Sequence, residues 1–322
     1  MLGWLAPAEK GIEIMTAPFI LPETAAVLAG LAEQGGPHLA DMSALDMRAT
    51  YLQLGALFDV PAETRVRCKD FVSAGCRLRA YFPTEAKAGP VILYMHGGGW
   101  VIGDLDSHHP LCTTMAAETG LRVIAVDYRL APEHVFPAAH DDCLAAAHFL
   151  MGSPPELEAP VTGIAVAGDS AGGNLALYVA SGMGPGGVLA QLLIYPLVDC
   201  TSPAQGSYKD FAEGYVLDRK LMDRFIADYL PDDHSAASSA ASPVLYPISA
   251  ELPATVVVTA GLDPLRDQGR ALAASISQLG VEVHFIEAKG LIHGMATMRA
   301  AFPSADQIIR RAIGLFAETM RN

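Results

Sequence analysis

The chain has little charge and no excess of basic residues. Charged residues occupy 17% of its 322 positions and hydrophobic ones 51%, so the sequence can form a large buried core and is unlike a disordered protein. Acidic residues outnumber basic ones by 35 to 21, which gives a formal net charge of −14. A phosphate backbone or an anionic lipid surface would repel such a chain, and we therefore exclude nucleic acid as a main partner.

Long apolar runs and paired cysteine motifs are also missing. Every apolar stretch is shorter than the roughly 18 residues of a membrane span, so we expect no membrane insertion. The N-terminal sequence MLGWLAPAEKGIEIM lacks a basic region followed by an apolar run, which argues against a signal peptide. The five cysteines are widely spaced, and their odd number is typical of unpaired, buried thiols in a reducing compartment. These observations together predict a cytoplasmic protein.

Short apolar strands alternate with helical segments over most of the chain. RVRCKDF and RLRAYF alternate polar and apolar residues, as in a strand pair with one solvated face. Five later runs are apolar almost throughout, which suits central parallel strands covered on both faces: VILYM, RVIAV, GIAVAG, QLLIY and TVVVTA. Alanine-rich helical stretches separate several of them, at 138–151, 171–182 and 269–279. This alternation predicts a doubly wound α/β sheet.

Two segments interrupt this alternation. Residues 22–35 and 42–58 have helical patterns, and the second carries an apolar stripe formed by Met47, Tyr51, Leu54 and Phe58. Residues 203–242 contain the helical stretch LDRKLMDRFIADYL and a Ser/Ala-rich loop. An insertion of about 40 residues in a regular sheet fold is usually functional, although a solvated excursion is the alternative. We expect the stripe to pack, as a lid, against Leu217, Leu221, Met222, Phe225 and Tyr229.

The strand GIAVAG runs directly into a G-x-S-x-G motif centred on Ser170. In this strand–turn–helix context the serine sits on a sharp turn, and its neighbours two positions away must be small for the turn to close. The N-terminus of the following helix favours developing negative charge. The motif therefore predicts a nucleophilic serine.

The strand VILYM ends in a second motif, His96-Gly97-Gly98-Gly99-Trp100. Three glycines let the backbone bend towards a ligand and direct its N–H groups into an open site. Such amides can form an oxyanion hole, where one donor stabilises a transition state by roughly 2.7–4 kcal/mol. A glycine-rich turn without a catalytic role is the alternative. The position of the motif, at a strand end upstream of the serine, favours the oxyanion hole.

A nucleophilic serine needs a base, and the base needs an orienting acid. Three histidines follow Ser170 in the chain. His234 lies in the Ser/Ala-rich segment, and His284 lies within the alternating strand VEVHFIEA. His293 lies in a glycine-flanked loop directly after that strand and is the best candidate for the base.

Asp263 is the best candidate for the acid. It is the first carboxylate beyond the strand TVVVTA, at the carboxyl edge where α/β sheets build their sites. Asp267 is expected to cap the next helix or to pair locally. The order Ser170, Asp263, His293 along the chain is that of the α/β hydrolases.

Taken together, these motifs resemble those of the bacterial hormone-sensitive-lipase-like (type IV) carboxylesterases. HGGGW, DYRLAPEHVFPAA, GDSAGGN, ASP before the seventh strand, DPLRD and a final HG follow that family's order over nearly the whole chain. The resemblance implies an α/β-hydrolase fold, in which a mostly parallel eight-stranded sheet is flanked by helices and covered by a helical cap. It divides the chain into an N-terminal cap segment, a first core part, a cap insertion and a second core part, at 1–58, 59–202, 203–242 and 243–322.

The resemblance also implies a chemistry. The chain would be a serine carboxylesterase, a carboxylic ester hydrolase with Ser170 as nucleophile, His293 as base and Asp263 as orienting acid. Its oxyanion hole would be formed by the amides of Gly98, Gly99 and Ala171, with Gly97 as a further candidate.

The resemblance implies small monomeric esters with short acyl chains as substrates, and it requires no metal and no organic cofactor. An amidase, a lactonase or a deacetylase on the same triad stays open, as does a catalytically silent ligand-binding relative. The family also leaves a homodimer through an edge strand open. The motifs indicate the chemistry but not the leaving group.

Several residues near the motifs carry expectations of their own. We expect His108 and His109 to be hydrogen-bonded histidines, because no further ligand spacing supports a metal site. Asp169 is expected to bond to the backbone. Met295 stands where the family often has an aromatic residue and predicts a softer pocket wall. Three charged residues of the DYRLAPEHVFPAAHDD stretch are expected to brace its loop: Arg129, Glu133 and Asp141.

Overall fold

An eight-stranded sheet forms the centre of the computed structural model, which describes residues 17–73, 75–83, 85, 87–201 and 205–321. The strand order is β1-β2-β4-β3-β5-β6-β7-β8. β2 runs antiparallel to β1 and β4, and all other neighbours are parallel. The predicted mostly parallel sheet is therefore confirmed. Its strands are β1 Arg67–Ser73, β2 Cys76–Phe82, β3 Gly89–Met95, β4 Arg122–Asp127, β5 Val161–Asp169, β6 Ala190–Ile194, β7 Ala254–Leu262 and β8 Val283–Ile292.

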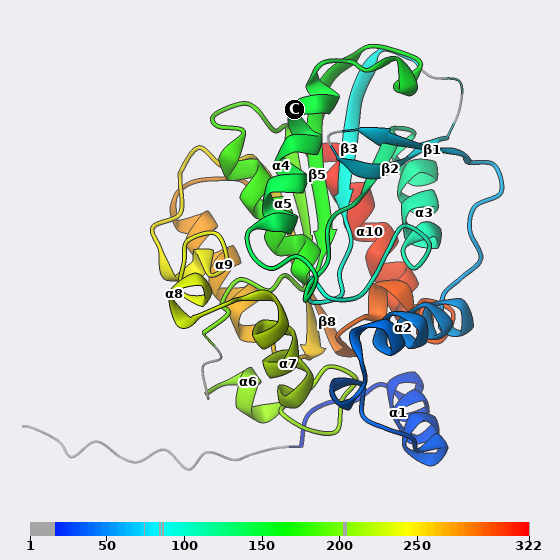
Figure 1. Cartoon of the computed structure of the whole chain (residues 1–322), viewed down its shortest axis with the longest axis vertical. Helices are drawn as coiled ribbons and strands as arrows, with labels where there is room; N and C mark the ends of the chain where they lie inside the picture. Colours follow the sequence, from blue (N-terminus) through cyan, green and yellow to red (C-terminus); the bar gives the residue numbers. More distant parts are fainter. Residues whose placement is uncertain (1–16, 74, 84, 86, 202–204, 322) are drawn as a thin grey trace, which may run out of the picture.

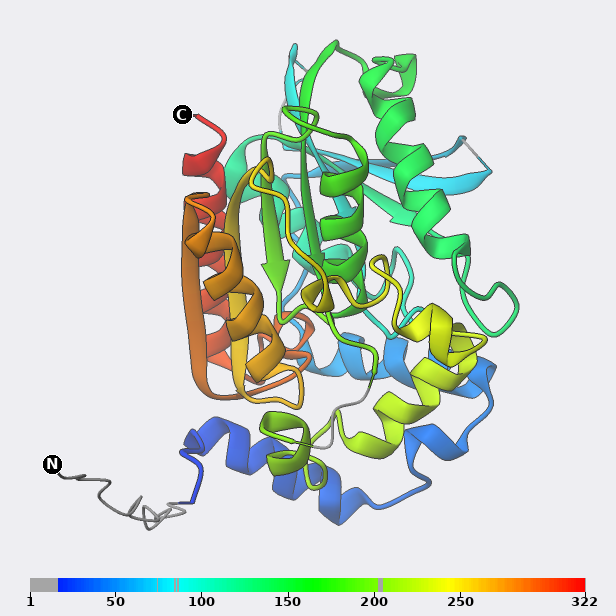
Figure 2. The same ribbon diagram turned by 90° about the vertical axis from the view of Figure 1, so that its left-hand side faces the viewer.

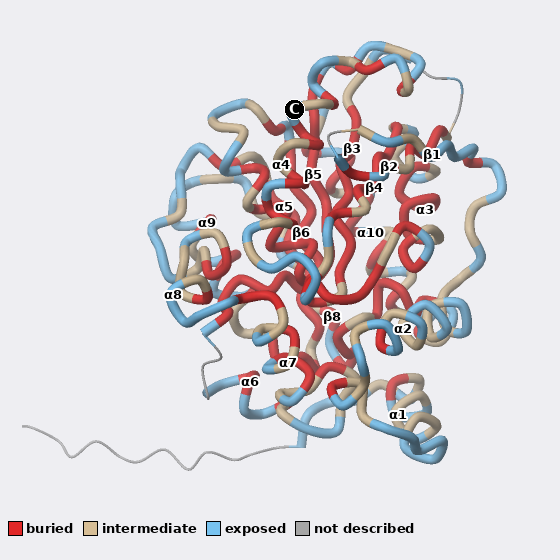
Figure 3. Tube along the Cα trace, viewed as in Figure 1, coloured by how far each residue is buried: buried red, intermediate tan, exposed pale blue. Residues whose placement is uncertain are grey.

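Helices cover both faces of this sheet (Figure 1). One face packs against α4 (Ala138–Met151), α5 (Ala171–Gly182) and α9 (Arg266–Gln278). The other packs against α3 (His109–Thr119) and α10 (Pro303–Thr319), for which the sequence analysis made no prediction. Figure 3 shows the buried strands between the two helix layers. Short 3-10 turns complete the connections, at η2 Pro155–Leu157, η3 Pro243–Leu245 and η4 Met295–Thr297.

The central strands are apolar almost throughout because each lies between two hydrophobic cores. In β5, Ile164 and Val166 belong to the core beneath α4 and α5, whereas Ala165 and Ala167 belong to the core beneath α10. Successive side chains of a strand point to opposite faces, so a strand with helices on both sides needs apolar residues at every position. The continuous apolar runs in the sequence were therefore correctly interpreted as central strands.

The edge strand β1 departs from the prediction. Its first four residues are exposed, and the expected alternation appears only in its neighbour β2. Cys68 consequently lies at the surface, which corrects the expectation that the cysteines are buried. The other four cysteines are buried, and all five thiols are free.

The remaining helices lie at the carboxyl ends of the parallel strands (Figures 1 and 2). The predicted N-terminal helices are confirmed, and the insertion holds a helix where LDRKLMDRFIADYL predicts one. A further short helix forms in the Ser/Ala-rich segment that was expected to be a loop, because Asp232 accepts a hydrogen bond from the Ser235 amide and caps it. These elements are α1 Pro22–Gln34, η1 Leu39–Asp41, α2 Ala44–Phe58, α6 Ser207–Asp210, α7 Arg219–Tyr229 and α8 Asp233–Ala236.

The N-terminal segment and the insertion meet where η1 packs against α7. His38 Nε2 lies 2.8 Å from Asp218 Oδ2, and Lys220 Nζ lies 2.7 Å from Asp41 Oδ2. Arg224 donates to the Ala40 carbonyl at 3.0 Å. Polar contacts therefore join two segments that are some 180 residues apart in the chain. Residues 1–16 of the predicted cap segment, and residues 203 and 204 of the insertion, lie outside the described residues.

Within the described residues, no helix combines the length and the apolar character needed to cross a membrane.

Candidate active site

Ser170 occupies a strained turn between β5 and α5. Its φ of 55° and ψ of −121° lie in a region that residues with a side chain rarely adopt. A Cβ atom on Gly168 would lie 2.2 Å from the Gly172 carbonyl oxygen, and one on Gly172 would lie 2.1 Å from the Met95 oxygen. The turn therefore requires both glycines of the motif, which confirms the strand–turn–helix context predicted for the serine.

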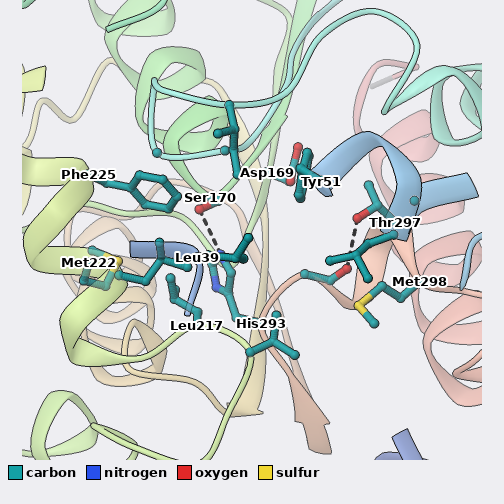
Figure 4. A pocket seen from close by; sticks show the side chains of 18 of the residues that line it. Leu39, Tyr51, Asp169, Ser170, Leu217, Met222, Phe225, His293, Thr297 and Met298 are labelled. Atoms are coloured by element: carbon teal, nitrogen blue, oxygen red, sulfur yellow. Dashed lines mark hydrogen bonds between the residues drawn. The ribbon is translucent and has the colours of Figure 1, made fainter. Parts of the chain in front are cut away.

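Ser170, His293 and Asp263 form a continuous hydrogen-bonded chain. Figure 4 shows the bond between Ser170 and His293. The Ser170 Oγ lies 2.9 Å from His293 Nε2, and His293 Nδ1 lies 2.8 Å from Asp263 Oδ2. Asp263 is fully buried, and its other oxygen accepts a bond from the Leu265 amide. Because the carboxylate accepts the Nδ1 proton, Nε2 is left free to accept the proton of the serine hydroxyl. The ring of Tyr195 packs on the imidazole, 4.4 Å from it between centroids.

The other residues considered for the base and the acid do not contact Ser170 or His293. His234 is exposed on α8, and His284 Nε2 contacts Glu282 at 2.9 Å on the edge strand β8. Asp267 lies in the first turn of α9, where it forms ion pairs with Arg266 and Arg270. The expected local pairing of Asp267 is confirmed, whereas the N-cap position belongs to a different residue.

The glycines of the HGGG motif adopt conformations that require glycine. Gly98 has a φ of 115° and Gly99 one of 58°. A Cβ atom on Gly98 would lie 2.2 Å from the Ile102 carbonyl oxygen, and one on Gly99 would lie 2.3 Å from the Phe225 ring. Both glycines line the same cavity as Ser170. In the part of the chain that is described, the amides of Gly98, Gly99 and Ala171 donate to no other group.

The Gly97 amide is not free in this way. It donates to Asp169 Oδ1 at 2.8 Å, so Gly97 is ruled out as a further oxyanion donor. The sequence could not show this, because the partner lies 72 residues further along the chain.

Asp169 is the centre of a buried polar network. Its Oδ1 accepts bonds from the Tyr94 hydroxyl at 2.6 Å and from the Gly97 amide, and His108 Nε2 lies 3.2 Å away. Burial raises the pKa of the Asp169 carboxyl, but the charge and hydrogen bond of His108 and the bond from Tyr94 outweigh it and hold that pKa below its usual value. The expected backbone bond of Asp169 is confirmed, and its carboxylate ties the glycine loop to the end of β5.

The histidine of the HGGG motif also contacts the glycine loop. His96 is buried, stacks on Tyr128 with 4.2 Å between ring centroids and contacts the Gly97 carbonyl through Nδ1 at 2.8 Å. Burial, with a contribution from His108, lowers the pKa of His96 to about 4, so the ring is neutral at pH 7. Trp100 has a φ of 62° and stacks on Tyr229 of α7 at 4.6 Å. Sequence reasoning assigned no role to these aromatic residues, although three of them lie within HGGGW and DYRLAPEH.

The predicted bracing of the DYRLAPEH stretch is partly correct. Glu133 forms an ion pair with Arg48 of α2 at 2.6 Å, and this hydrogen bond lowers the pKa of Glu133 to about 2. Arg129, however, pairs with Asp142 rather than with Asp141, which is exposed. On α4 the two aspartates point in different directions, and only the buried one meets the arginine.

An apolar cavity of about 860 Å³, including its part open to solvent, contains Ser170 and His293 (Figure 4). The two predicted apolar stripes both contribute to its wall rather than packing only against each other. The N-terminal segment contributes Leu31, Leu39, Tyr51, Leu54 and Phe58. The insertion contributes Val216, Leu217, Leu221, Met222 and Phe225.

Three buried residues from the two predicted stripes and the loop after His293 do not line the cavity. Met47 is buried in the core, and Tyr229 packs against Trp100, so neither lines the cavity. Met295 is also fully buried, and Met298 takes its place in the cavity wall. The expectation of a softer wall at Met295 is therefore wrong.

The described residues contain no cluster of three or more side chains that could hold a metal ion. His109 Nδ1 contacts the Tyr81 hydroxyl at 3.4 Å, and His108 contacts Asp169. Both histidines therefore have hydrogen-bonding partners, as expected.

Several known proteins that are similar to this chain are ester hydrolases. Residues 92–297 match a family described by the alpha/beta hydrolase fold. The chain is 36% identical over 246 residues to carboxylesterase NlhH of Mycobacterium tuberculosis, covering 73% of this chain and 76% of that protein. It is also 36% identical over 239 residues to an ethyl acetate hydrolase of Pseudomonas putida, covering 71% and 74%.

Solved structures extend the similarity to almost the whole chain. An ester hydrolase from the metagenome of Lake Arreo, determined in complex with a bipyridine phosphonate derivative, superposes with a TM-score of 0.87. The two chains are 33% identical, and the match covers 94% of this chain and 100% of the other.

Replacing Asp169 should destabilise the protein strongly. Asp169→Ala leaves the Tyr94 hydroxyl, the Gly97 amide and His108 buried without their partner, so the free energy of unfolding should fall by about 3–5 kcal/mol. Urea denaturation of the purified variants measures this difference. Asp141→Ala is the matched control and should cost about 1 kcal/mol or less, because that exposed carboxylate only favours a helix N-terminus. Equal losses in the two variants would show that the network does not stabilise the fold.

Proposed function

The chain belongs to the α/β-hydrolase family, within its bacterial hormone-sensitive-lipase-like carboxylesterases, and from this premise we propose that it hydrolyses short-chain carboxylic esters on Ser170. Its relatives are esterases, and the chain is a carboxylic ester hydrolase. The proposal specifies the catalytic residues, the acyl-enzyme intermediate and the preferred chain length.

One observation carries the proposal. Ser170, His293 and Asp263 are linked by hydrogen bonds of 2.9 and 2.8 Å inside an apolar cavity, next to the unpartnered amides of the glycine loop. A nucleophile bonded to a base that an acid orients is the arrangement that acyl transfer requires.

In the first half-reaction, Ser170 Oγ attacks the ester carbonyl carbon while His293 Nε2 accepts the hydroxyl proton. Asp263 holds the imidazole in its tautomer and stabilises the imidazolium that forms. The carbonyl oxygen becomes an oxyanion that accepts hydrogen bonds from the amides of Gly98, Gly99 and Ala171. The tetrahedral intermediate then collapses, and His293 returns the proton to the departing alcohol.

In the second half-reaction, water replaces the alcohol. His293 takes a proton from the water, whose oxygen attacks the acyl carbon, and the same amides stabilise the second oxyanion. Collapse releases the carboxylic acid and restores the Ser170 hydroxyl. Every proton transfer uses groups of this chain, the substrate and water, and the proposed mechanism contains no metal or organic cofactor.

The cavity supports a preference for short apolar substrates. Apart from the triad residues, its wall offers few polar groups, among them Tyr51 and Thr297, and Asp169 is engaged by its own partners. We assign the cover over this cavity to 1–58 and 203–242, as a cap in two parts. The similarity to an ethyl acetate hydrolase also supports a small acyl group.

We also propose a cellular location for the protein and consider its oligomeric state. Five free thiols support a cytoplasmic location, since a reducing compartment keeps cysteines unpaired. A homodimer through an edge strand stays a prediction. The described edges of the sheet are β1 and β8.

Covalent labelling tests the nucleophile. A fluorophosphonate probe should label the wild-type protein at Ser170, and Ser170→Ala should lose both the label and ester turnover while keeping its thermal unfolding temperature. Loss of a triad member typically lowers the rate by far more than a hundredfold, to about a thousandth or less. A folded Ser170→Ala variant that keeps more than about a hundredth of the wild-type rate contradicts the assignment. A protein that neither reacts with the probe nor turns over esters would be a silent binder.

The two aspartates near β7 provide a matched comparison. Asp263→Asn should lower kcat far more than Asp267→Asn, by up to about 10⁴-fold, because only Asp263 contacts the imidazole and sets its tautomer. Steady-state rates of equally folded variants measure the ranking. The reverse order would transfer the orienting role to Asp267.

Acyl chain length tests the covered cavity. With a series of aryl esters, kcat/KM should be highest for acyl groups of about two to eight carbons and should fall steeply at about twelve to sixteen, because additional methylenes find no enclosed space. Matched aryl amides measured beside the esters test the preference for ester bonds. A profile that is flat with chain length would contradict the assignment of a closed cap and leave the triad unaffected.

A further inference from the structure

A second cavity lies directly beside the catalytic one. It is a groove along α1, lined by Glu23, Ala26, Val27, Gly30, Gln34 and Ala301. Leu31 and Phe58 belong to the walls of both cavities, and they are the two side chains that the groove shares with the catalytic cavity. In the described structure, these side chains therefore form a partition between Ser170 and the outer groove.

The Phe58 side of the partition is fixed in place. Phe58 is the last residue of α2, and its carbonyl accepts bonds from the Ala300 and Ala301 amides at 2.9 and 3.1 Å. The next residue, Asp59, forms a buried ion pair with Arg299 at 2.8 Å. The end of α2 is therefore bound to the segment that follows the catalytic histidine loop.

The Leu31 side is held differently. The described hydrogen bonds from α1 to the core come from its first turn, where Thr24 Oγ1 donates to the Gly290 carbonyl and Glu23 accepts from the Ser304 amide. Leu31 lies in the last turn, shortly before Gly35, and contacts its neighbours through apolar surface.

The two cavities have the same chemical character along the partition. Most residues that line the groove are alanine, valine, leucine, glycine or phenylalanine. Its polar residues, Glu23 and Gln34, lie at the two ends of α1. An alkyl chain entering from the catalytic side would continue to meet apolar surface beyond Leu31 and Phe58.

We infer that Leu31 and Phe58 set the length limit for one alkyl chain of the ester, and that the groove along α1 is a latent extension of the substrate pocket. This inference rests on the proposed ester hydrolysis at Ser170. The chain that meets the partition belongs either to the acyl group or to the alcohol. Two series of substrates distinguish these: p-nitrophenyl esters of increasing acyl length and acetate esters of increasing alcohol length.

The first experiment removes the partition. Phe58→Ala should raise the ratio of kcat/KM for the twelve-carbon substrate to that for the four-carbon one by about tenfold or more in one series, because each methylene that gains burial contributes roughly fourfold. Leu31→Ala should act in the same direction and serves if Phe58→Ala does not fold. Leu54→Ala is the matched control, since Leu54 lies one turn earlier on α2 and lines only the catalytic cavity. It should change the ratio by about twofold at most.

The second experiment closes the groove again from outside. A Cβ atom on Gly30 meets nothing within 4 Å, and Gly30 lines the groove but not the catalytic cavity. Gly30→Phe should leave the wild-type ratio unchanged, and it should cancel the gain when combined with Phe58→Ala. Thermal unfolding of each variant verifies that it is folded.

The outcomes distinguish a failure of the inferred partition from a failure of the proposed ester hydrolysis. Equal gains from Phe58→Ala and Leu54→Ala would overturn the inference, because enlargement of the cavity alone would then be sufficient. A gain that survives Gly30→Phe would also overturn it, because the longer chain would not occupy the groove. No gain in either series, with short esters still hydrolysed, overturns the partition and leaves the proposed function intact. A wild-type protein that hydrolyses no ester removes the proposed function, and the inference with it.

Discussion

The hydrogen bond from the Gly97 amide to Asp169 determines the geometry of the site. It joins the loop after β3 to the end of β5, and these two strands are direct neighbours in the sheet. Their ends approach so closely that a single Cβ on Gly172 would collide with the Met95 carbonyl. Ser170 and the amides of the glycine loop are therefore positioned by the same contact, and neither loop can shift without moving the other.

Residues of α2 and α7 contact the segments around this hydrogen bond. Arg48 of α2 donates to the carbonyl of Val101, directly after the HGGGW motif, and to that of Ala131, within the DYRLAPEH stretch. From the insertion, Tyr229 stacks on Trp100, and its hydroxyl oxygen lies 2.8 Å from His140 Nδ1. Both helical segments that are remote from the sheet in sequence thus support the loop beside Ser170. Contacts with this loop, as well as contacts around the cavity, therefore determine where these two segments lie.

The strands, the helices α1, α2, α4, α5, α7 and α9, and three residues that the structure joins by hydrogen bonds, Ser170, Asp263 and His293, could be predicted from the sequence because these features produce local patterns. Continuous apolar runs identify strands with two cores, and the G-x-S-x-G and HGGG motifs identify turns that only glycine permits. Features decided by distant partners were missed or misplaced. The engagement of Gly97 depends on Asp169, and the choice of Asp142 over Asp141 depends on which face of α4 meets Arg129. The exposure of Cys68 follows from the edge position of β1, which no local pattern reveals.

The buried ion pair between Arg299 and Asp59 has a consequence for the cooperativity of the molecule. Both side chains are almost completely excluded from water, and they connect the end of α2 to the segment after His293. Separating them would leave the buried Asp59 carboxylate without its cationic partner, so partial opening of α2 alone is strongly disfavoured. The helix and the histidine loop therefore belong to one cooperative unit, whose amide protons should exchange with solvent at a common rate. His293 therefore keeps its position relative to Ser170 for as long as that unit remains closed.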